Sequence, residues 1–241
     1  MSPLVGAALQ GVLPGFVAGL LVAWSGRGRW LPAAFPIGLL GAYALLKHWP
    51  PWPWDLARGS NDGTQWVLWS VAAAAVLGVA GAGHARRARD FALGAAVLVT
   101  QTWLLLTNLR ARWTPTESVV QVAGSALVLV ASFAIASRVM APHRCTPNVV
   151  RVLFAALVLD GVVLAIGGSF LLAQLAGAIA AVVAGVLATG RKVAPPTWAR
   201  AALPLASAHG GLLLAGHHFA EPELWTVLAA ALLPAAAFVA R

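Results

Sequence analysis

Charged residues are scarce in this sequence: they occupy 10% of its 241 positions, whereas soluble domains carry about 25%. Hydrophobic residues make up 60% of the chain, and its mean hydropathy is +0.83. The interior of a soluble domain of this length cannot enclose that much apolar surface. The hydrocarbon core of a bilayer accepts apolar surface and needs about 20 mostly apolar residues per helical crossing. The composition therefore predicts an all-α integral membrane protein.

Cysteine is almost absent, because Cys145 is the only one, and no disulfide can form within the chain. The sequence also lacks the patterns HExxH, GxSxG, CxxC, Asn-x-Ser/Thr and GxxxxGK followed by Ser or Thr. These patterns carry metalloprotease, hydrolase, redox, glycosylation and nucleotide-phosphate chemistry. We therefore assign no catalytic residue and expect no cofactor. Energy from a nucleotide would have to come from another polypeptide.

Long apolar runs are abundant instead, and charged or Pro/Gly-rich breaks separate them. Runs of about 16 to 22 residues predict about nine transmembrane helices in a single transmembrane domain over residues 1–241. Their ranges are 3–24, 31–46, 65–83, 91–109, 119–140, 149–167, 170–190, 201–216 and 225–240. A single helix over residues 149–190 would be about 60 Å long, roughly twice the hydrocarbon thickness. We therefore expect a hairpin near Gly167, Gly168 and Ser169, and eight crossings is the alternative count.

The position of the cations predicts the orientation, because cytoplasmic loops collect Lys and Arg. With the N-terminus outside and the C-terminus inside, twelve of the 16 cations fall on the inner side: Arg27, Arg29, Arg86, Arg87, Arg89, Arg138, Arg144, Arg151, Arg191, Lys192, Arg200 and Arg241. Topology then accounts for the net charge of +9 without nucleic acid as a partner. We expect a polytopic bundle in an inner membrane of bacterial type. The expected partners are the lipid bilayer and either other membrane subunits or further copies of the chain.

Residues 47–64 form a Trp/Pro-rich loop that this orientation places outside. Its residues Trp49, Trp52, Trp54 and Asp55 admit two interpretations. Tryptophan prefers the headgroup level, so the loop is first an interfacial anchor. Alternatively, the aromatic rings and the carboxylate would hold a cationic ligand through cation–π contacts.

The segment Trp52-Pro53-Trp54-Asp55 followed by Arg58 resembles a fragment of the tryptophan-rich periplasmic motif of haem-handling proteins in cytochrome c maturation. That family's glycine is missing here, prolines are added, and the arginine is shifted by one position. In the family, the loop supports haem and histidines from neighbouring outer loops ligate it. The resemblance implies that His48, His217 and His218 would be the candidate haem ligands, since all lie on the same predicted side.

Asp160 is the only acidic residue inside a predicted span, where an ionisable side chain costs at least about 2.5–3.5 kcal/mol and normally faces the protein interior. Counting residues along the spans places His209 at a similar depth, and Gln101 near that level. A carboxylate and an imidazole at mid-membrane are the groups that a proton relay or a cation site uses. The alternative is an interhelical hydrogen bond worth about 0.6 kcal/mol, with no role in transport.

Two further patterns carry weaker predictions. His217 and Glu221 have the spacing of a metal-ligand pair on one helical face, although two ligands do not make a site. Glycine and alanine recur at four-residue intervals in the spans 3–24 and 170–190, which lets helices approach closely. That spacing favours packing within the chain or between subunits and does not discriminate between functions.

These features favour transport of a small solute, a proton or another cation, with Asp160, His209 and Gln101 along the pathway. A non-catalytic scaffold or accessory subunit of a larger membrane complex is the second hypothesis. A membrane-embedded enzyme, haem-handling or other, is the third, since no catalytic constellation is visible.

The orientation can be tested with single cysteines introduced into a Cys145→Ser chain. We expect Leu56→Cys to react with a membrane-impermeant maleimide on intact cells, and Arg87→Cys to react only after the membrane is permeabilised. Labelling of both cysteines from the same side would show that the predicted topology is wrong.

Overall fold

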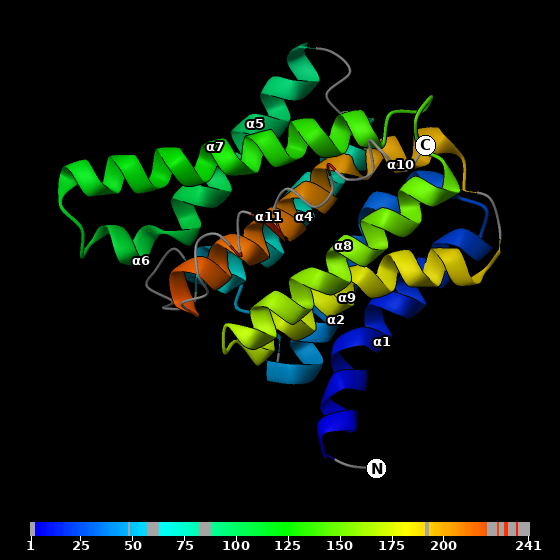
Figure 1. Ribbon diagram of the computed structural model, residues 1–241, viewed down its shortest axis with the longest axis horizontal. Helices are drawn as coiled ribbons and strands as arrows, with labels where there is room; N and C mark the ends of the chain where they lie inside the picture. Colours follow the sequence, from blue (N-terminus) through cyan, green and yellow to red (C-terminus); the bar gives the residue numbers. More distant parts are fainter. Residues whose placement is uncertain are drawn as a thin grey trace.

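The computed structural model describes residues 3–47, 49–56, 63–81, 88–190 and 193–220, together with positions 226, 229, 230 and 235. Secondary structure in these residues is helical, without a strand (Figure 1). The long helices are α1 (Pro3–Trp24), α2 (Leu31–Lys47), α4 (Thr64–Val79), α5 (Ala88–Leu105), α7 (Pro115–Val139), α8 (Pro147–Ile166), α9 (Phe170–Ala188) and α11 (Ala202–Phe219). The short ones are η1 (Gly28–Trp30), α3 (Pro53–Leu56), α6 (Thr107–Arg110) and α10 (Pro195–Arg200).

The long helices begin and end within about one turn of the predicted spans, which is the usual uncertainty of helix boundaries. The last predicted span, 225–240, lies outside the described residues apart from four isolated positions. The all-α prediction is confirmed for the described part of the chain. The short helices α3, α6 and α10 were not predicted.

Four stretches in the described residues are long and apolar enough to cross a membrane: Gly28–Lys47, Pro115–Val139, Pro147–Ile166 and Phe170–Ala188. Two shorter apolar helices, Leu9–Trp24 and Thr64–Val79, accompany them. Helices α5 and α11 are not among the four, and each carries polar residues in its apolar run, including Gln101 and His209. The four stretches indicate a membrane location for the protein.

The hairpin predicted within residues 149–190 is present between α8 and α9. Helix α8 ends at Ile166, and Gly168 has a φ of 86°, a left-handed conformation that glycine adopts without steric cost. The backbone N–H of Leu172 then donates to Ser169 Oγ at 3.4 Å, which caps the start of α9. The two glycines and the serine therefore reverse the chain where the sequence indicated.

Threonine and proline set the start of α7 and α8. Thr114 and Glu117 form a reciprocal capping box, in which each side chain accepts from the other residue's backbone N–H, and Pro115 follows at the first helical position. Thr146 Oγ1 accepts from a backbone N–H in the first turn of α8, which begins with Pro147.

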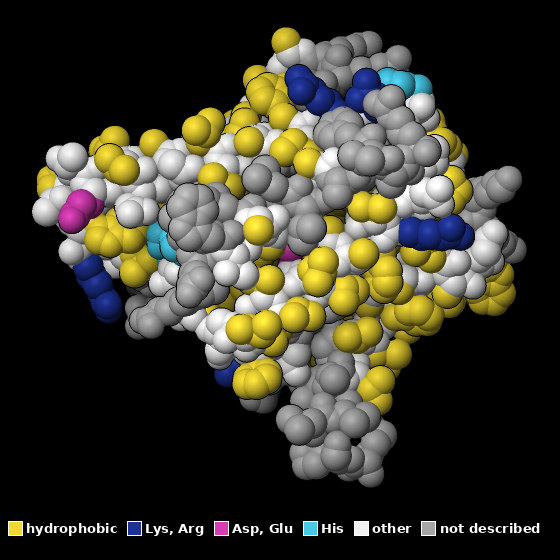
Figure 2. Space-filling view, viewed as in Figure 1, with side chains coloured by type: hydrophobic (Ala, Val, Ile, Leu, Met, Phe, Trp, Pro, Cys, Tyr) yellow, Lys and Arg dark blue, Asp and Glu magenta, His cyan; other side chains and the backbone are white. Residues whose placement is uncertain are grey.

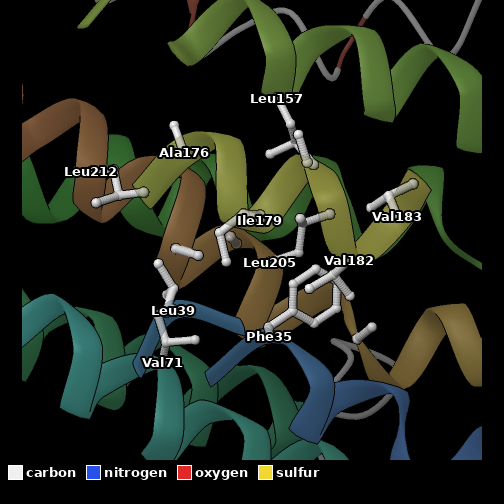
Figure 3. Packing of buried hydrophobic residues seen from close by; sticks show 14 of the residues in the cluster. Phe35, Leu39, Val71, Leu157, Ala176, Ile179, Val182, Val183, Leu205 and Leu212 are labelled. Atoms are coloured by element: carbon white, nitrogen blue, oxygen red, sulfur yellow. The ribbon is translucent and has the colours of Figure 1, made fainter. Parts of the chain in front are cut away.

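Helix α11 is the central helix of the described structure. It contacts α2, α4, α5, α7, α8 and α9, and its residues from Ala202 to Leu213 are all buried. Glycines make this enclosure possible: a Cβ at Gly210 would overlap Leu129, and one at Gly216 would overlap Leu164. Leu205 of α11, Phe35 of α2 and Ile179 of α9 belong to one cluster of buried hydrophobic residues (Figure 3).

Helices α1 and α9 pack backbone to backbone. A Cβ at Gly15 would overlap the carbonyl oxygen of Ala178, and one at Gly19 would overlap that of Val182. Gly185 of α9 meets the Phe16 carbonyl of α1 in the same way. The small residues that the sequence spaces by four therefore form an interface within this chain.

The described connections between long helices lie at the two opposite ends of these helices (Figure 1). One end, called here the basic end, contains η1, the end of α4, residues 140–146 and α10, where Gly28 lies against Thr197 and Gly78 against the Arg200 carbonyl. The other, the aromatic end, contains α3, α6 and the end of α11, where Gly63 lies against Phe219. Described cations at the basic end are Arg27, Arg29, Arg89, Arg138, Arg144, Arg151 and Arg200, whereas Lys47, Arg110 and Arg112 lie at the aromatic end.

Replacing both Gly15 and Gly19 by Ala should separate α1 from α9 and lower the free energy of unfolding by about 1–3 kcal/mol, because each new Cβ meets a backbone carbonyl. Thermal unfolding in mild detergent measures the change. Gly124→Ala in α7 is the control, since a Cβ there meets nothing within 4 Å. Equal stability of the double variant and the control would contradict the proposed packing.

Candidate functional site

Asp160 of α8 and His209 of α11 are in direct contact, with 2.5 Å between Asp160 Oδ2 and His209 Nδ1. Both residues are buried, with relative exposures of 1% and 4%. Residue counting along the two predicted spans indicated this proximity. Their assignment to an ion or solute pathway stays a prediction.

Among the described residues, His209 is the ionisable partner of Asp160, and no Lys or Arg forms an ion pair with this carboxyl group. The second carboxyl oxygen, Asp160 Oδ1, is buried and has no hydrogen-bond partner in the same part of the chain. A buried carboxyl oxygen without a donor is costly, and it is a position where a proton or a cation would be favoured. The proton between the two residues can therefore lie on the carboxyl group or on the imidazole, and no further acid or base is needed for this exchange.

A small cavity of about 10 Å³ adjoins His209 between α7, α8 and α11. Ser132 of α7, Leu157 of α8 and Ala206 of α11 are among the residues around it. That volume corresponds to about one water molecule. Both residues of the pair are buried, and the cavity beside His209 has space for about one water molecule.

Gln101 of α5 binds a different residue of α11, Ser207. Gln101 Nε2 donates to the Ser207 carbonyl oxygen at 2.9 Å, and Ser207 Oγ donates to Gln101 Oε1 at 2.7 Å. Both side chains are fully buried. Gly211 makes room for them, because a Cβ there would overlap Gln101 Nε2.

The three predicted pathway residues therefore belong to two separate pairs: Asp160 binds His209, and Gln101 binds Ser207. Ser207 and His209 are two positions apart, so they project about 200° apart around a helix. Asp160 approaches one face of α11, and Gln101 approaches another. Ser207 was missed, because a serine in an apolar helix usually bonds its own backbone and carries no signal in the sequence.

The described part of the aromatic loop is tied to α4. Trp52 stacks on Trp69 with 5.4 Å between ring centroids, and Trp69 Nε1 donates to the Pro51 carbonyl oxygen at 2.9 Å. Trp49 is 57% exposed, and Asp55 lies exposed in α3. The side chain of Trp54 lies outside the described residues.

The candidate haem and metal ligands are only partly described. His48 and Arg58 of the haem-motif resemblance, and Glu221 of the metal-ligand pair, lie outside the described residues. His217 and His218 end α11 with 4.9 Å between ring centroids, and His218 is 5.8 Å from Trp113. Among the residues that were described, no group of three His, Cys, Asp or Glu could hold a metal ion.

Cys145 lies between α7 and α8 at the basic end and is buried. Burial raises the pKa of its thiol to about 12. Since the thiolate is the reactive form, this raised pKa lowers the reactivity of Cys145 near neutral pH.

Comparisons of the chain with protein-family models, with curated proteins and with solved structures find no match. Within the described structure, the Asp160–His209 pair combines burial, titratable groups and an unsatisfied oxygen. These properties are typical of a site that binds a proton or a cation.

The low reactivity that burial gives the Cys145 thiol can be tested by chemical labelling. At pH 8 its thiol, with a pKa of about 12, is almost fully protonated, so N-ethylmaleimide should react about 1,000-fold more slowly than with a free cysteine of pKa near 8.5. Mass spectrometry of the intact chain follows the labelling, and unfolding in dodecyl sulfate is the control that restores it. Rapid labelling of the folded protein at pH 8 would contradict the burial of the thiol.

Proposed function

We propose that this chain is a polytopic protein of a bacterial-type inner membrane that transports a proton, another cation or a small solute. The Asp160–His209 pair is the protonation site of this mechanism. The observation that carries the proposal is the direct contact of a buried carboxyl and a buried imidazole on two different helices. Intramembrane ionisable residues that face one another are typical of proton and ion pathways.

The distribution of described cations supports the topology within this proposal. The basic end holds seven of the ten described cations assigned to the two ends, and it becomes the inner end under the positive-inside rule. The aromatic end, with Trp49, Trp52 and Trp113, becomes the outer rim. Nine crossings result if residues 225–240 also span the membrane, with the N-terminus outside.

The mechanism requires α8 and α11 to separate when the pair changes its protonation. With Asp160 ionised and His209 protonated, Coulomb attraction holds the two helices together in a low-dielectric interior. Transfer of a proton or binding of a cation at Asp160 Oδ1 weakens that attraction. On the other face, the Gln101–Ser207 pair cannot titrate, and it keeps α11 attached to α5 during the change. The enclosed geometry then corresponds to an occluded state.

An accessory subunit of a larger membrane complex is the second candidate function. The enclosure of the pair favours it, because the cavity beside His209 is only about 10 Å³. In that case Asp160 and His209 would join two helices and carry no flux. The two functions predict different consequences of removing the charge at position 160.

Asp160→Asn keeps the shape of the side chain and removes its proton equilibrium. In proteoliposomes containing entrapped pyranine, we expect the parent protein to dissipate an imposed pH gradient in the presence of Na⁺ or K⁺. The Asp160→Asn variant should fall to the rate of protein-free liposomes.

The matched control is Thr102→Val, which removes a buried hydroxyl that donates to the Leu98 carbonyl oxygen of its own helix and leaves every titratable group in place. This control should keep the flux and its pH dependence. Equal rates for the parent and Asp160→Asn would rule out the transport role of the pair and favour the accessory subunit.

A further inference from the structure

Apolar residues surround the cavity beside His209. Eight described residues of α7, α8 and α11 line this cavity of about 10 Å³, and six of them are Ala or Leu. Ser132 and His209 are the other two, and they supply its polar side-chain atoms. On the face shown in Figure 2, hydrophobic side chains cover much of the surface over α8 and α9, whereas Lys and Arg lie at the margins. The described residues around the Asp160–His209 pair therefore offer few polar groups to an incoming ion.

The helices around the pair are poor sources of ligands for a metal cation. Metal cations such as Na⁺ and K⁺ exchange their hydration shell for several oxygen atoms, and in transporters an unwound stretch of helix provides them. Helices α8 and α11 are unbroken at Asp160 and His209, so the carbonyl oxygens there accept from backbone N–H groups of their own helix. Asp160 Oδ1 is the buried carboxyl oxygen that has no hydrogen-bond partner in the described part of the chain. One such oxygen is too few for a metal cation and sufficient for a proton.

The imidazole ring of His209 connects the cavity to the carboxyl group. His209 Nδ1 contacts Asp160 Oδ2, and the same ring lines the cavity. Asp160 is not among the described residues that line the cavity. An imidazole can take up a proton on one ring nitrogen and release another from the second. A proton that reaches the cavity therefore has a direct route to Asp160 through the ring.

Ser132 of α7 is placed to hold a water molecule beside that ring. Its hydroxyl donates to the Val128 carbonyl oxygen of the same helix at 2.9 Å, so its oxygen remains available as an acceptor. The cavity has space for about one water molecule. A water molecule that donates to Ser132 Oγ is held next to the imidazole and can exchange a proton with it.

We propose that the Asp160–His209 pair binds a proton and not a metal cation, and that the proton arrives through one water molecule held by Ser132. This inference rests on the proposed transport function and narrows its substrate.

The transfer starts from an ionised Asp160 and a neutral His209 that carries its proton on Nδ1. A hydronium ion in the cavity gives a proton to the other ring nitrogen and becomes water. The N–H bond at Nδ1 breaks as this new N–H bond forms, and the released proton forms an O–H bond at Asp160 Oδ2. The carboxyl group is then neutral, which lowers the cost of burying Oδ1 without a donor.

The experiment measures proton flux in proteoliposomes that contain pyranine and carry an imposed pH gradient. The thiocyanate salts of Na⁺, K⁺ and N-methyl-D-glucamine are compared at equal concentration, because thiocyanate crosses the bilayer by itself and balances the charge. We expect the full-length protein to give the same rate in all three salts. A flux that requires Na⁺ or K⁺ would overturn this inference and leave the proposed transport function in place. Absence of protein-dependent flux in every salt would overturn both.

Ser132→Ala removes the acceptor for the water molecule and should slow the flux about fivefold, as expected for the loss of one hydrogen bond. Ser125→Ala is the matched control and should keep the parent rate, since Ser125 is a buried serine of the same helix outside the cavity lining. Ser132→Thr keeps the hydroxyl and should restore most of the rate, which separates the relay from packing. Equal rates for Ser132→Ala and Ser125→Ala would overturn the proposed water relay.

Discussion

The contact between Asp160 and His209 is the constraint on which the arrangement around α11 depends. A carboxyl group in an apolar interior must meet a hydrogen-bonding partner, because its desolvation is otherwise uncompensated. Helix α8 packs mainly on α9 and meets α11 near Asp160, so the pair fixes where these two helices face one another. Gln101 does the same for α5 on another face of α11. The central helix is thus held by two polar contacts of different character, one titratable and one neutral.

Close backbone packing provides the rigid surroundings for that helix. Gly15 and Gly19 let the backbone of α1 lie directly on the backbone of α9, and Gly210, Gly211 and Gly216 let side chains of neighbouring helices reach the backbone of α11. Lipid tails are as apolar as leucine, so helix association in a membrane depends on such contacts more than on hydrophobic exclusion. A change at Asp160 would therefore be transmitted to a closely packed set of helices, which respond by shifting as units.

Much of the helical fold could be predicted from apolar runs and their breaks, because a membrane helix has to be long and apolar whatever its neighbours are. The hairpin at Gly168 and the depth match of Asp160 with His209 followed from length alone. Tertiary contacts could not be predicted in this way, and Ser207 is an example, since nothing in the sequence distinguishes it from other serines. Topology explained Arg138, Arg144 and Arg200 in the sequence, whereas the fold shows that they line one cavity at the basic end, although they come from three separate segments.

The helices differ in length, and a bilayer responds to that difference. Helix α7 has 25 residues and α4 has 16, which correspond to about 37 Å and about 24 Å at 1.5 Å per residue. A hydrocarbon layer of about 30 Å matches neither length: a helix as long as α7 fits it by tilting, and a helix as short as α4 fits it only where the lipid is thinner. The exposed side chain of Val76 lies on α4, at the surface that such a thinner layer would contact under the proposed topology. That topology implies that lipids with short acyl chains collect along α4.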